Sequence, residues 1–185
     1  GEQLSRVNML LDFSRQLSGL EQERILHLLA ETALAVVQPA QACIATLFDP
    51  EQQTLKPQVA MGYAHADVMP QLRFRLDDAL VGKAFKSGKT IRVHDVDFAA
   101  HYSLSQEDLL KYRRAMGEAL PVSSMAIPIQ TADQVAGVLI LDNFEKSNAF
   151  SHDNQMLAAS LARQTGLTLE NIRLYQAAEQ HTSQL

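Results

Sequence analysis

Cysteine and tryptophan are scarce in this sequence, and it has no long apolar run. Its 185 residues contain one cysteine, Cys43, and no tryptophan. One cysteine cannot form a disulfide within the chain, and a cysteine-rich metal site is excluded. This usage fits a reducing compartment, so a cytoplasmic location is expected. No apolar run approaches the roughly 20 residues that cross a bilayer, and no signal-peptide pattern opens the sequence. We therefore expect no membrane contact by this segment.

An excess of positive charge is also missing. The formal net charge is −5 at pH 7, and the basic residues are scattered along the chain. Binding of a phosphate backbone needs a basic face, so nucleic acid is not an expected partner. Apolar residues make up 46% of the sequence and charged residues 20%, which is typical of a folded globular domain.

Common catalytic motifs are absent as well. The sequence contains no G-x-x-x-x-G-K-[ST], no G-x-S-x-G and no H-E-x-x-H. Its carboxylates are spread through loops and expected helix starts, where capping accounts for them. We therefore expect a domain that is not an enzyme, with no catalytic residues and no metal ligands.

Helical patterns stand at both ends of the chain. Apolar residues recur at helical spacing over residues 4–17, and Ser18-Gly19-Leu20-Glu21 has the pattern of a capping box for a second helix. That helix is expected to stop at Gln38-Pro39, because proline cannot continue it. Ser151 is expected to cap a long last helix that runs towards Gln180.

Alternating or β-branched segments lie between these helices and predict strands. The expected strands are residues 42–48, 54–61, 72–76, 90–93, 122–129 and 134–142. Short helices are expected at 79–87, ended by Gly88, and at 106–116, capped by Ser105. Several connections are too short for a parallel crossover. The predicted fold class is α+β, with a central antiparallel sheet of five to six strands. The N- and C-terminal helices cover one face, and short helices and loops form a pocket on the other.

Three stretches in this order resemble the GAF family of sensory domains, which is related to the PAS fold. Residues 80–91 (LVGKAFKSGKTI) are similar to the family's helix-turn-strand. Residues 124–129 (SMAIPI) and 135–141 (VAGVLIL) resemble its paired strands, and the segment from Phe150 to Tyr175 resembles its last helix. The resemblance implies a six-stranded antiparallel sheet, a ligand cavity on one face and flanking helices that dimerise.

The resemblance divides the chain into three parts and implies a role for each. Residues 1–19 are expected to form a linker or dimerisation helix, residues 20–175 the GAF domain, and residues 176–185 the start of a helical linker. The implied function is small-molecule sensing that regulates an attached output domain, namely a kinase, a cyclase or phosphodiesterase, or a transcriptional activator. The alternative is a dimerisation or protein-interaction module without a ligand.

Departures from the family's specialised motifs leave the ligand open. Asn143 is followed by Phe144 rather than by the lysine of cyclic-nucleotide-binding members, and Cys43 lies in a hydrophobic strand, unlike a bilin-linked cysteine. One cysteine cannot complete the cycle of the methionine-sulfoxide-reducing members. A third alternative is a haem or metal sensor that uses His94 or His101, which no motif supports. Cyclic nucleotide, bilin and haem are therefore not predicted as cofactors.

The expected ligand pocket lies between the sheet and the loop and helix that follow the fourth strand. Core packing is the alternative for its aromatic members, and a solvated loop with aspartate turns is the alternative for its histidines. The residues predicted to line the pocket are Phe74, Val81, Phe85, His94, Asp95, His101, Tyr102, Tyr112, Met116 and Ser124.

The terminal helices are predicted to pair two copies of the chain in parallel. Apolar residues of the last helix fall at heptad-like spacing, and the first helix carries a shorter seam. A shift of these helices would pass a change in the pocket to an output domain. The predicted seam residues are Leu4, Val7, Leu11, Leu161, Thr168, Ile172 and Tyr175.

Overall fold

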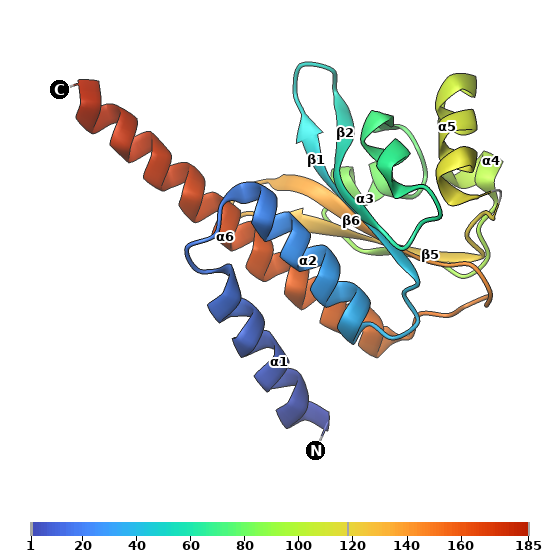
Figure 1. Cartoon of the computed structure of the whole chain (residues 1–185), viewed down its shortest axis with the longest axis horizontal. Coiled ribbons are helices and arrows are strands. Elements are labelled where there is room, and N and C mark those ends of the chain that lie inside the picture. Colours follow the sequence, from blue (N-terminus) through green and yellow to red (C-terminus); the bar gives the residue numbers. More distant parts are fainter. Residues whose placement is uncertain (1, 118, 185) are drawn as a thin grey trace.

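The computed structural model describes residues 2–117 and 119–184, which form a sheet covered on both faces (Figure 1). One face carries α1 (Glu2–Leu17), α2 (Gln22–Val36) and α6 (His152–Gln184). The other carries the 3-10 helix η1 (Ala66–Gln71) with α3 (Val81–Ser87), α4 (Phe98–His101) and α5 (Gln106–Met116). The strands are β1 (Ala42–Asp49), β2 (Thr54–Met61), β3 (Phe74–Arg75), β4 (Ile91–Val93), β5 (Ser123–Gln130) and β6 (Val135–Asn143).

The sheet has six strands in the order β3-β2-β1-β6-β5-β4, and every neighbouring pair is antiparallel. The central strands β1 and β6 join the two halves of the chain, with Ala42 opposite Asp142 and Leu47 opposite Gly137. This arrangement confirms the predicted α+β class and its antiparallel sheet. A one-residue slip between β1 and β6 would exchange the two buried faces, so the two-sided core fixes the register.

Most predicted caps are confirmed, and one is wrong. The hydroxyls of Ser105 and Ser151 accept hydrogen bonds from the backbone amides of Asp108 and Asn154, at 3.1 Å each. Gly88 ends α3 in the left-handed conformation, with φ of 66°. The capping box predicted at residues 18–21 does not form, because α2 starts after Glu21 and no side chain bonds the amides of its first turn. The helices η1 and α4 lie in segments where the sequence predicted a loop or no element.

Two apolar clusters lie on opposite faces of the sheet. The helix-side core joins α1, α2 and α6 to the sheet, through residues such as Phe13 and Leu139. The tyrosine-side core joins η1, α3 and α5 to the other face, through residues such as Phe74 and Ile140. Each fully buried leucine, isoleucine or phenylalanine contributes roughly 1.5–3 kcal/mol to folding. The sheet is therefore held from both sides, and the candidate site belongs to the second core.

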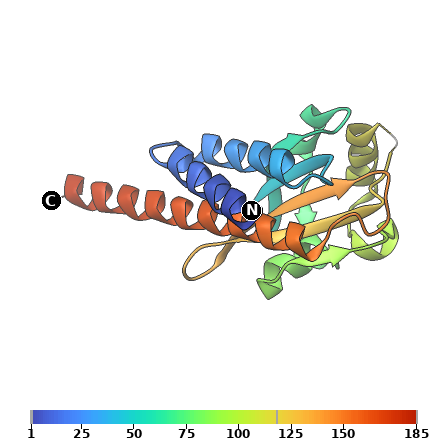
Figure 2. The same cartoon turned by 90° about the horizontal axis from the view of Figure 1, so that it is seen from below.

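The last helix, α6, is much longer than the sheet that it covers. Its first half packs against β5 and α2, and its second half continues beyond the sheet (Figure 2). The closest contact is at Gly166, where a Cβ atom would lie 1.8 Å from the backbone oxygen of Gln130. Glycine therefore lets the helix backbone touch the end of β5. Among the described residues, no helix combines the length and apolar character needed to cross a membrane.

Replacing Gly166 with alanine tests this contact. Glycine to alanine inside an open helix stabilises by about 1 kcal/mol. Here the added methyl group meets the backbone of β5, so we expect the free energy of unfolding to fall by about 1–3 kcal/mol in urea denaturation. The control is Asn171→Ala, at an exposed position of the same helix. If Gly166→Ala is as stable as the unchanged protein, the close contact between α6 and β5 is contradicted.

Candidate functional site

Asp142 is a fully buried acid on the central strand β6. Its Oδ1 accepts a hydrogen bond from the hydroxyl of Ser124 at 2.5 Å, and its Oδ2 accepts one from the hydroxyl of Tyr63 at 2.6 Å. Ser124 lies opposite Asp142 on β5, and Tyr63 follows the end of β2. Strand pairing and a turn thus bring three residues distant in sequence into one polar cluster.

The electrostatics of this cluster are those of a carboxyl group without a counter-ion. Burial raises the pKa of Asp142 to about 6, and the hydrogen bonds from Ser124 and Tyr63 oppose that rise. Burial and the nearby Asp142 raise the pKa of Tyr63 well above its ordinary value. No lysine or arginine within the described part of the chain forms an ion pair with Asp142. A buried ionised carboxylate without a cation is costly.

Aromatic side chains fill the space beside this polar cluster. The hydroxyls of Tyr102 and Tyr112 lie 3.5 Å apart, and Phe98 stacks on Tyr102 with ring centroids 4.6 Å apart. Phe74 contacts both tyrosines, each at 6.3 Å between centroids. Tyr102 and Tyr112 are buried, and the carboxyl of Asp142 contributes to raising the pKa of each. The segment from α4 to α5 thus closes over the site with aromatic rings.

The structure brings six of the predicted pocket residues into the tyrosine-side core or its polar cluster. Phe85 lies at the edge of this core, half-buried, and stacks on Phe48 with centroids 4.8 Å apart. The six buried residues are Phe74, Val81, Tyr102, Tyr112, Met116 and Ser124.

The other three predicted residues lie elsewhere. The side chains of His94 and Asp95 are exposed, and Asp95 accepts a hydrogen bond from the hydroxyl of Ser147. The ring nitrogen Nδ1 of His101 accepts from the backbone amide of Asp97 at 2.9 Å, which folds the ring onto its own loop. No three His, Cys, Asp or Glu side chains come together as metal ligands within residues 2–117 and 119–184.

Asp78 is a second buried acid on the same side of the sheet. Its Oδ1 accepts from the amides of Leu80 and Gly82, at 3.1 and 2.6 Å, and so fixes the start of α3 as predicted for Asp77 or Asp78. Its Oδ2 is buried and has no hydrogen-bond partner among the described residues. Burial raises the pKa of Asp78 to about 6, although these amide hydrogen bonds lower it. Its main role is therefore to support the helix beside the site.

Cys43 lies on the opposite face of the sheet, in the helix-side core. Its thiol donates a hydrogen bond to the backbone oxygen of Ala30, with 3.6 Å between the heavy atoms. Burial, and to a lesser extent the charge of Asp142, raises the pKa of the thiol to about 12. The reactive form of cysteine is the thiolate, so this side chain acts as a small apolar residue of the core.

The seam predicted on the terminal helices is only partly exposed. Leu161, predicted for the pairing seam, is 1% exposed and packs inside the helix-side core, where this stripe of α6 covers the sheet. Thr168 and Ile172 are half-buried. The exposed seam residues are Leu4, Val7, Leu11 and Tyr175.

Sequence reasoning missed Asp142 and Tyr63. Asp142 ends a strand of apolar residues, and it shares a strand face with Ile140 because strand side chains alternate. An acid on the same strand face as an apolar residue was the one sign in the sequence that Asp142 is buried. Tyr63 follows Gly62, where φ is 85°, and nothing local predicts that its hydroxyl reaches residue 142.

The chain belongs to the GAF domain family, whose pattern matches residues 19–170. No curated protein matches it. Among solved structures, the chain is similar to the GAF domain of a phosphoenolpyruvate-protein phosphotransferase from Coxiella burnetii, at 18% identity and a TM-score of 0.76, over 94% of this chain and 98% of that one.

Two further structures show the range of proteins that share this fold. Residues 122 to 287 of a methyl-accepting chemotaxis protein are 20% identical, with a TM-score of 0.72, over 89% of this chain and 99% of that one. Free methionine-R-sulfoxide reductase from Neisseria meningitidis, solved with its substrate, is 20% identical, with a TM-score of 0.68, over 92% of this chain and 91% of that one. At these identities the likeness shows the fold, which serves regulation and catalysis alike.

The raised pKa of Asp142 predicts how stability depends on pH. Because the folded state holds this proton more tightly than the unfolded state, whose carboxyl has a pKa of 3.8, the stability contribution is complete below 3.8 and is lost as the pH rises through about 6. Between about pH 5 and about pH 8, this group should lower the free energy of unfolding of the unchanged protein by about 1–2 kcal/mol. We expect that part of the decrease to be absent in Asp142→Asn.

Chemical denaturation at the two pH values measures this difference. The matched control is Asp67→Asn, an exposed acid of η1 that should keep the pH dependence of the unchanged protein. The same pH dependence in Asp142→Asn and Asp67→Asn would contradict a raised pKa at Asp142.

Proposed function

We propose that this GAF domain binds a small molecule with a cationic group beside Asp142 and regulates an attached output domain through α6. The observation that carries the proposal is the buried carboxyl of Asp142, whose hydrogen-bond partners among the described residues are the hydroxyls of Ser124 and Tyr63 alone. An ammonium group placed there would supply the counter-ion that the described residues do not. The nearby rings of Tyr102 and Tyr112 favour the same ligand, because aromatic faces attract cations.

Entry of a ligand requires part of the aromatic cover to move. Tyr102 and Phe98 lie on or beside α4, a helix of four residues that contributes no fully buried residue of its own. Such a short segment can swing outwards at lower cost than a strand or a long helix. We infer that residues 97–105 act as the lid of the site, which opens to admit a ligand.

The route to the output domain runs through the sheet. Ser124 faces Asp142 on one side of β5, and α6 packs against β5 on the other side. A ligand that binds Asp142 also acts on its hydrogen-bond partner Ser124, and so on the strand that supports α6. This helix continues beyond the sheet (Figure 2). The similar domains of phosphotransferase and chemotaxis proteins support an attached output domain of the signalling kind.

Binding rather than catalysis is the function that the described residues support. The similar protein from Neisseria meningitidis is a reductase by name. In this chain the only cysteine, Cys43, is buried on the far face of the sheet with its pKa raised to about 12. A reductive thiol cycle needs a second thiol to resolve the oxidised first one.

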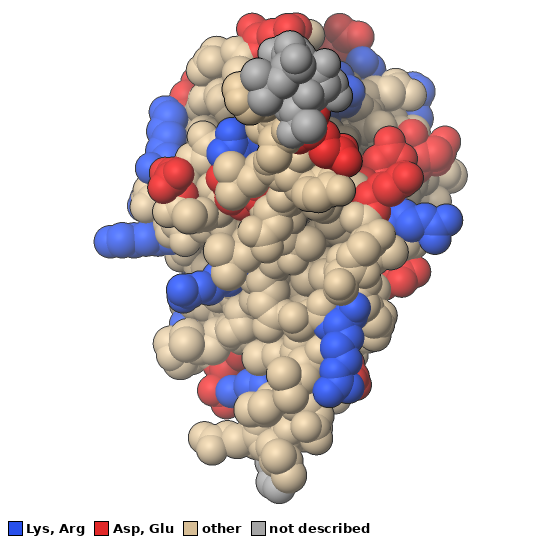
Figure 3. All heavy atoms as spheres, turned by 90° about the vertical axis from the view of Figure 1, so that its left-hand side faces the viewer, with Lys and Arg blue, Asp and Glu red and all other residues tan. Residues whose placement is uncertain are grey.

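A second candidate function is a dimerisation module without a ligand. The contacts between Phe74, Phe98, Tyr102 and Tyr112 favour it, because these rings already fill the tyrosine-side core. Exposed apolar residues on α1, such as Leu11, also favour it. Figure 3 shows a broad surface between the two chain ends where charged residues lie mainly at the margins. Burial of such a surface would stabilise a pair of chains.

Thermal unfolding with a panel of primary amines tests the ligand proposal. The panel pairs each amine, such as tyramine, with the neutral alcohol of the same shape. An amine at about 100 times its Kd stabilises the fold by about 2.7 kcal/mol, or roughly 5–10 °C in Tm. We expect this shift in the unchanged protein and in the control Asp67→Asn, but not in Asp142→Asn. Equal shifts in Asp142→Asn, or no shift with any amine, would remove the proposal and leave the second candidate.

Replacing Leu11 with aspartate tests the pairing of chains. Leu11 is 49% exposed, so a charge there leaves the single chain folded and disfavours any pairing that would bury it. We expect at least tenfold weaker dimerisation in sedimentation equilibrium, while the exposed neighbour Gln16→Asp has little effect. Equal dimerisation of the two variants would exclude α1 from the interface.

A further inference from the structure

A groove lies where α6 leaves the sheet, at the edge of both buried cores. It has a volume of about 380 Å³ and lies between the end of β1, the turn from β5 to β6, and α6. Its apolar lining includes Leu47, Phe48 and Ile172, and its polar lining includes Gln134, Glu170 and Arg173. This volume is within the range of sites that hold small molecules.

Opposite charges stand side by side on the helical wall of the groove. The Nε and Nη2 atoms of Arg173 donate to the carboxylate of Glu170, at 3.2 and 2.6 Å. The side chain of Glu170 is 11% exposed and that of Arg173 is 63% exposed. The Nη1 group of Arg173 has no hydrogen-bond partner among the described residues. The wall therefore offers both a charged donor and a charged acceptor.

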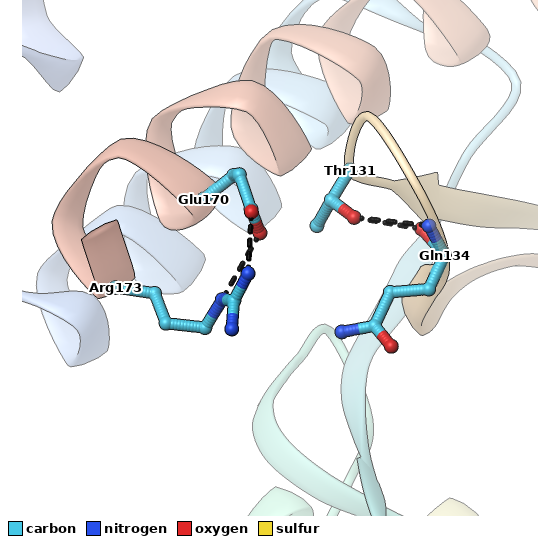
Figure 4. A network of polar contacts seen from close by, with 4 residues as sticks. All are labelled: Thr131, Gln134, Glu170 and Arg173. Carbon is cyan, nitrogen blue, oxygen red and sulfur yellow. Dashed lines mark hydrogen bonds and ion pairs between the residues drawn. The ribbon is translucent and has the colours of Figure 1, made fainter. Parts of the chain in front are cut away.

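The opposite wall is the turn between β5 and β6. The hydroxyl of Thr131 bonds the backbone of Gln134 twice, accepting from its amide at 3.2 Å and donating to its oxygen at 3.0 Å. These bonds close the turn and leave the side-chain amide of Gln134 free to extend towards Arg173 on α6 (Figure 4). Glu170 and Arg173 are bonded to each other, and no hydrogen bond among the described residues joins either of them to the turn. The two walls therefore face each other without a polar contact between them.

This lining favours one class of ligand. A simple anion would pair with Arg173 but would be repelled by Glu170 and by the nearby Asp133, whose charge acts on Arg173. A simple cation would meet the guanidinium. A molecule with a carboxylate and an ammonium on one carbon satisfies both, through charge-assisted hydrogen bonds. Leu47, Phe48 and Ile172 then offer apolar contact to a side chain.

We propose that the groove between the β5–β6 turn and α6 binds an α-amino acid with an apolar side chain. Its carboxylate lies at Arg173, its ammonium at Glu170, and its side chain against the apolar lining. This site is separate from Asp142, and the proposal does not depend on the function proposed above.

The position of the groove gives such binding a regulatory effect. At Gly166 the backbone of α6 touches the end of β5, and Glu170 and Arg173 follow one and two turns later. A ligand that bridges Arg173 and the β5–β6 turn therefore acts on α6 just beyond Gly166, where the helix contacts β5. Occupancy sets the direction in which the rest of the helix leaves the sheet.

Calorimetric titration with L-leucine and L-phenylalanine tests the site. The comparison probes are 4-methylpentanoate, which lacks the ammonium, and isoamylamine, which lacks the carboxylate. Both probes and both amino acids are titrated into Asp142→Asn, so that an amine bound at Asp142 does not contribute. We expect at least one of the two amino acids to bind with a Kd of about 1 mM or tighter, and both probes to bind about tenfold more weakly or not at all. Failure of both amino acids to bind at this level would overturn the proposal.

Variants locate the binding. Arg173→Gln should weaken it about 10- to 100-fold, and Ala136→Trp, which places a large ring in the groove, should remove it. The control Arg163→Gln, at an exposed arginine of α6 outside the groove, should bind as the unchanged protein does. Circular dichroism confirms that each variant is folded.

Asp142→Asn separates this proposal from the proposed function. It should bind the amino acid unchanged, even if the amine panel detects no ligand at Asp142. Loss of amino-acid binding in Asp142→Asn but not in Arg173→Gln would place the ligand in the tyrosine-side core and overturn the groove. Unchanged binding in both Arg173→Gln and Ala136→Trp would overturn it as well.

Discussion

The carboxyl group of Asp142 is buried near the end of the central strand β6 without a cation among the described residues, and our account of the domain depends on it. Two hydroxyl groups, from Ser124 and Tyr63, are its hydrogen-bond partners. They hold it in place but do not balance its charge, so burial raises its pKa to about 6. A strand residue with this environment weakens the fold when ionised. It is also the group at which we propose that a positively charged ligand binds.

The sheet connects this acid to the helix that leaves the domain. β5 supplies Ser124 to the polar cluster on one face and supports α6 on the other, with Gly166 allowing direct backbone contact. The groove beside Arg173 begins where that contact ends. The two sites that we propose, the interior of the tyrosine-side core and the outer groove, would therefore both act on the same helix.

Much of the fold could be predicted from the sequence, because it depends on local patterns. The β-branched residues of β6, the cap at Ser151 and the left-handed Gly88 each act over a few residues, and the structure contains the strand, the cap and the left-handed glycine. The capping box at residues 18–21 failed because the right residue types at the right spacing do not fix the backbone that a cap needs. Leu161 was placed in the predicted pairing seam by helical spacing, which does not show that this part of the apolar stripe covers the sheet.

The site was harder to predict, because its contacts are distant in sequence. Tyr102 and Tyr112 could be chosen from their place in a loop and its following helix, and both are buried beside the polar cluster. Asp142 could not be ranked above other acids until the pairing of β5 with β6 placed Ser124 against it. The histidines of the same loop drew attention by residue type alone, and the structure leaves His94 on the surface.

Carbon-13 NMR of the Asp142 carboxyl, followed from acid to neutral pH, tests the central claim most directly. The assignment comes from comparison with Asp142→Asn. The account predicts a titration midpoint near the raised pKa of about 6, and a shift to lower pH when an amine binds beside the carboxyl. A midpoint near the ordinary 3.8, unchanged by any amine, would show that Asp142 is already neutralised or solvated and would contradict the account.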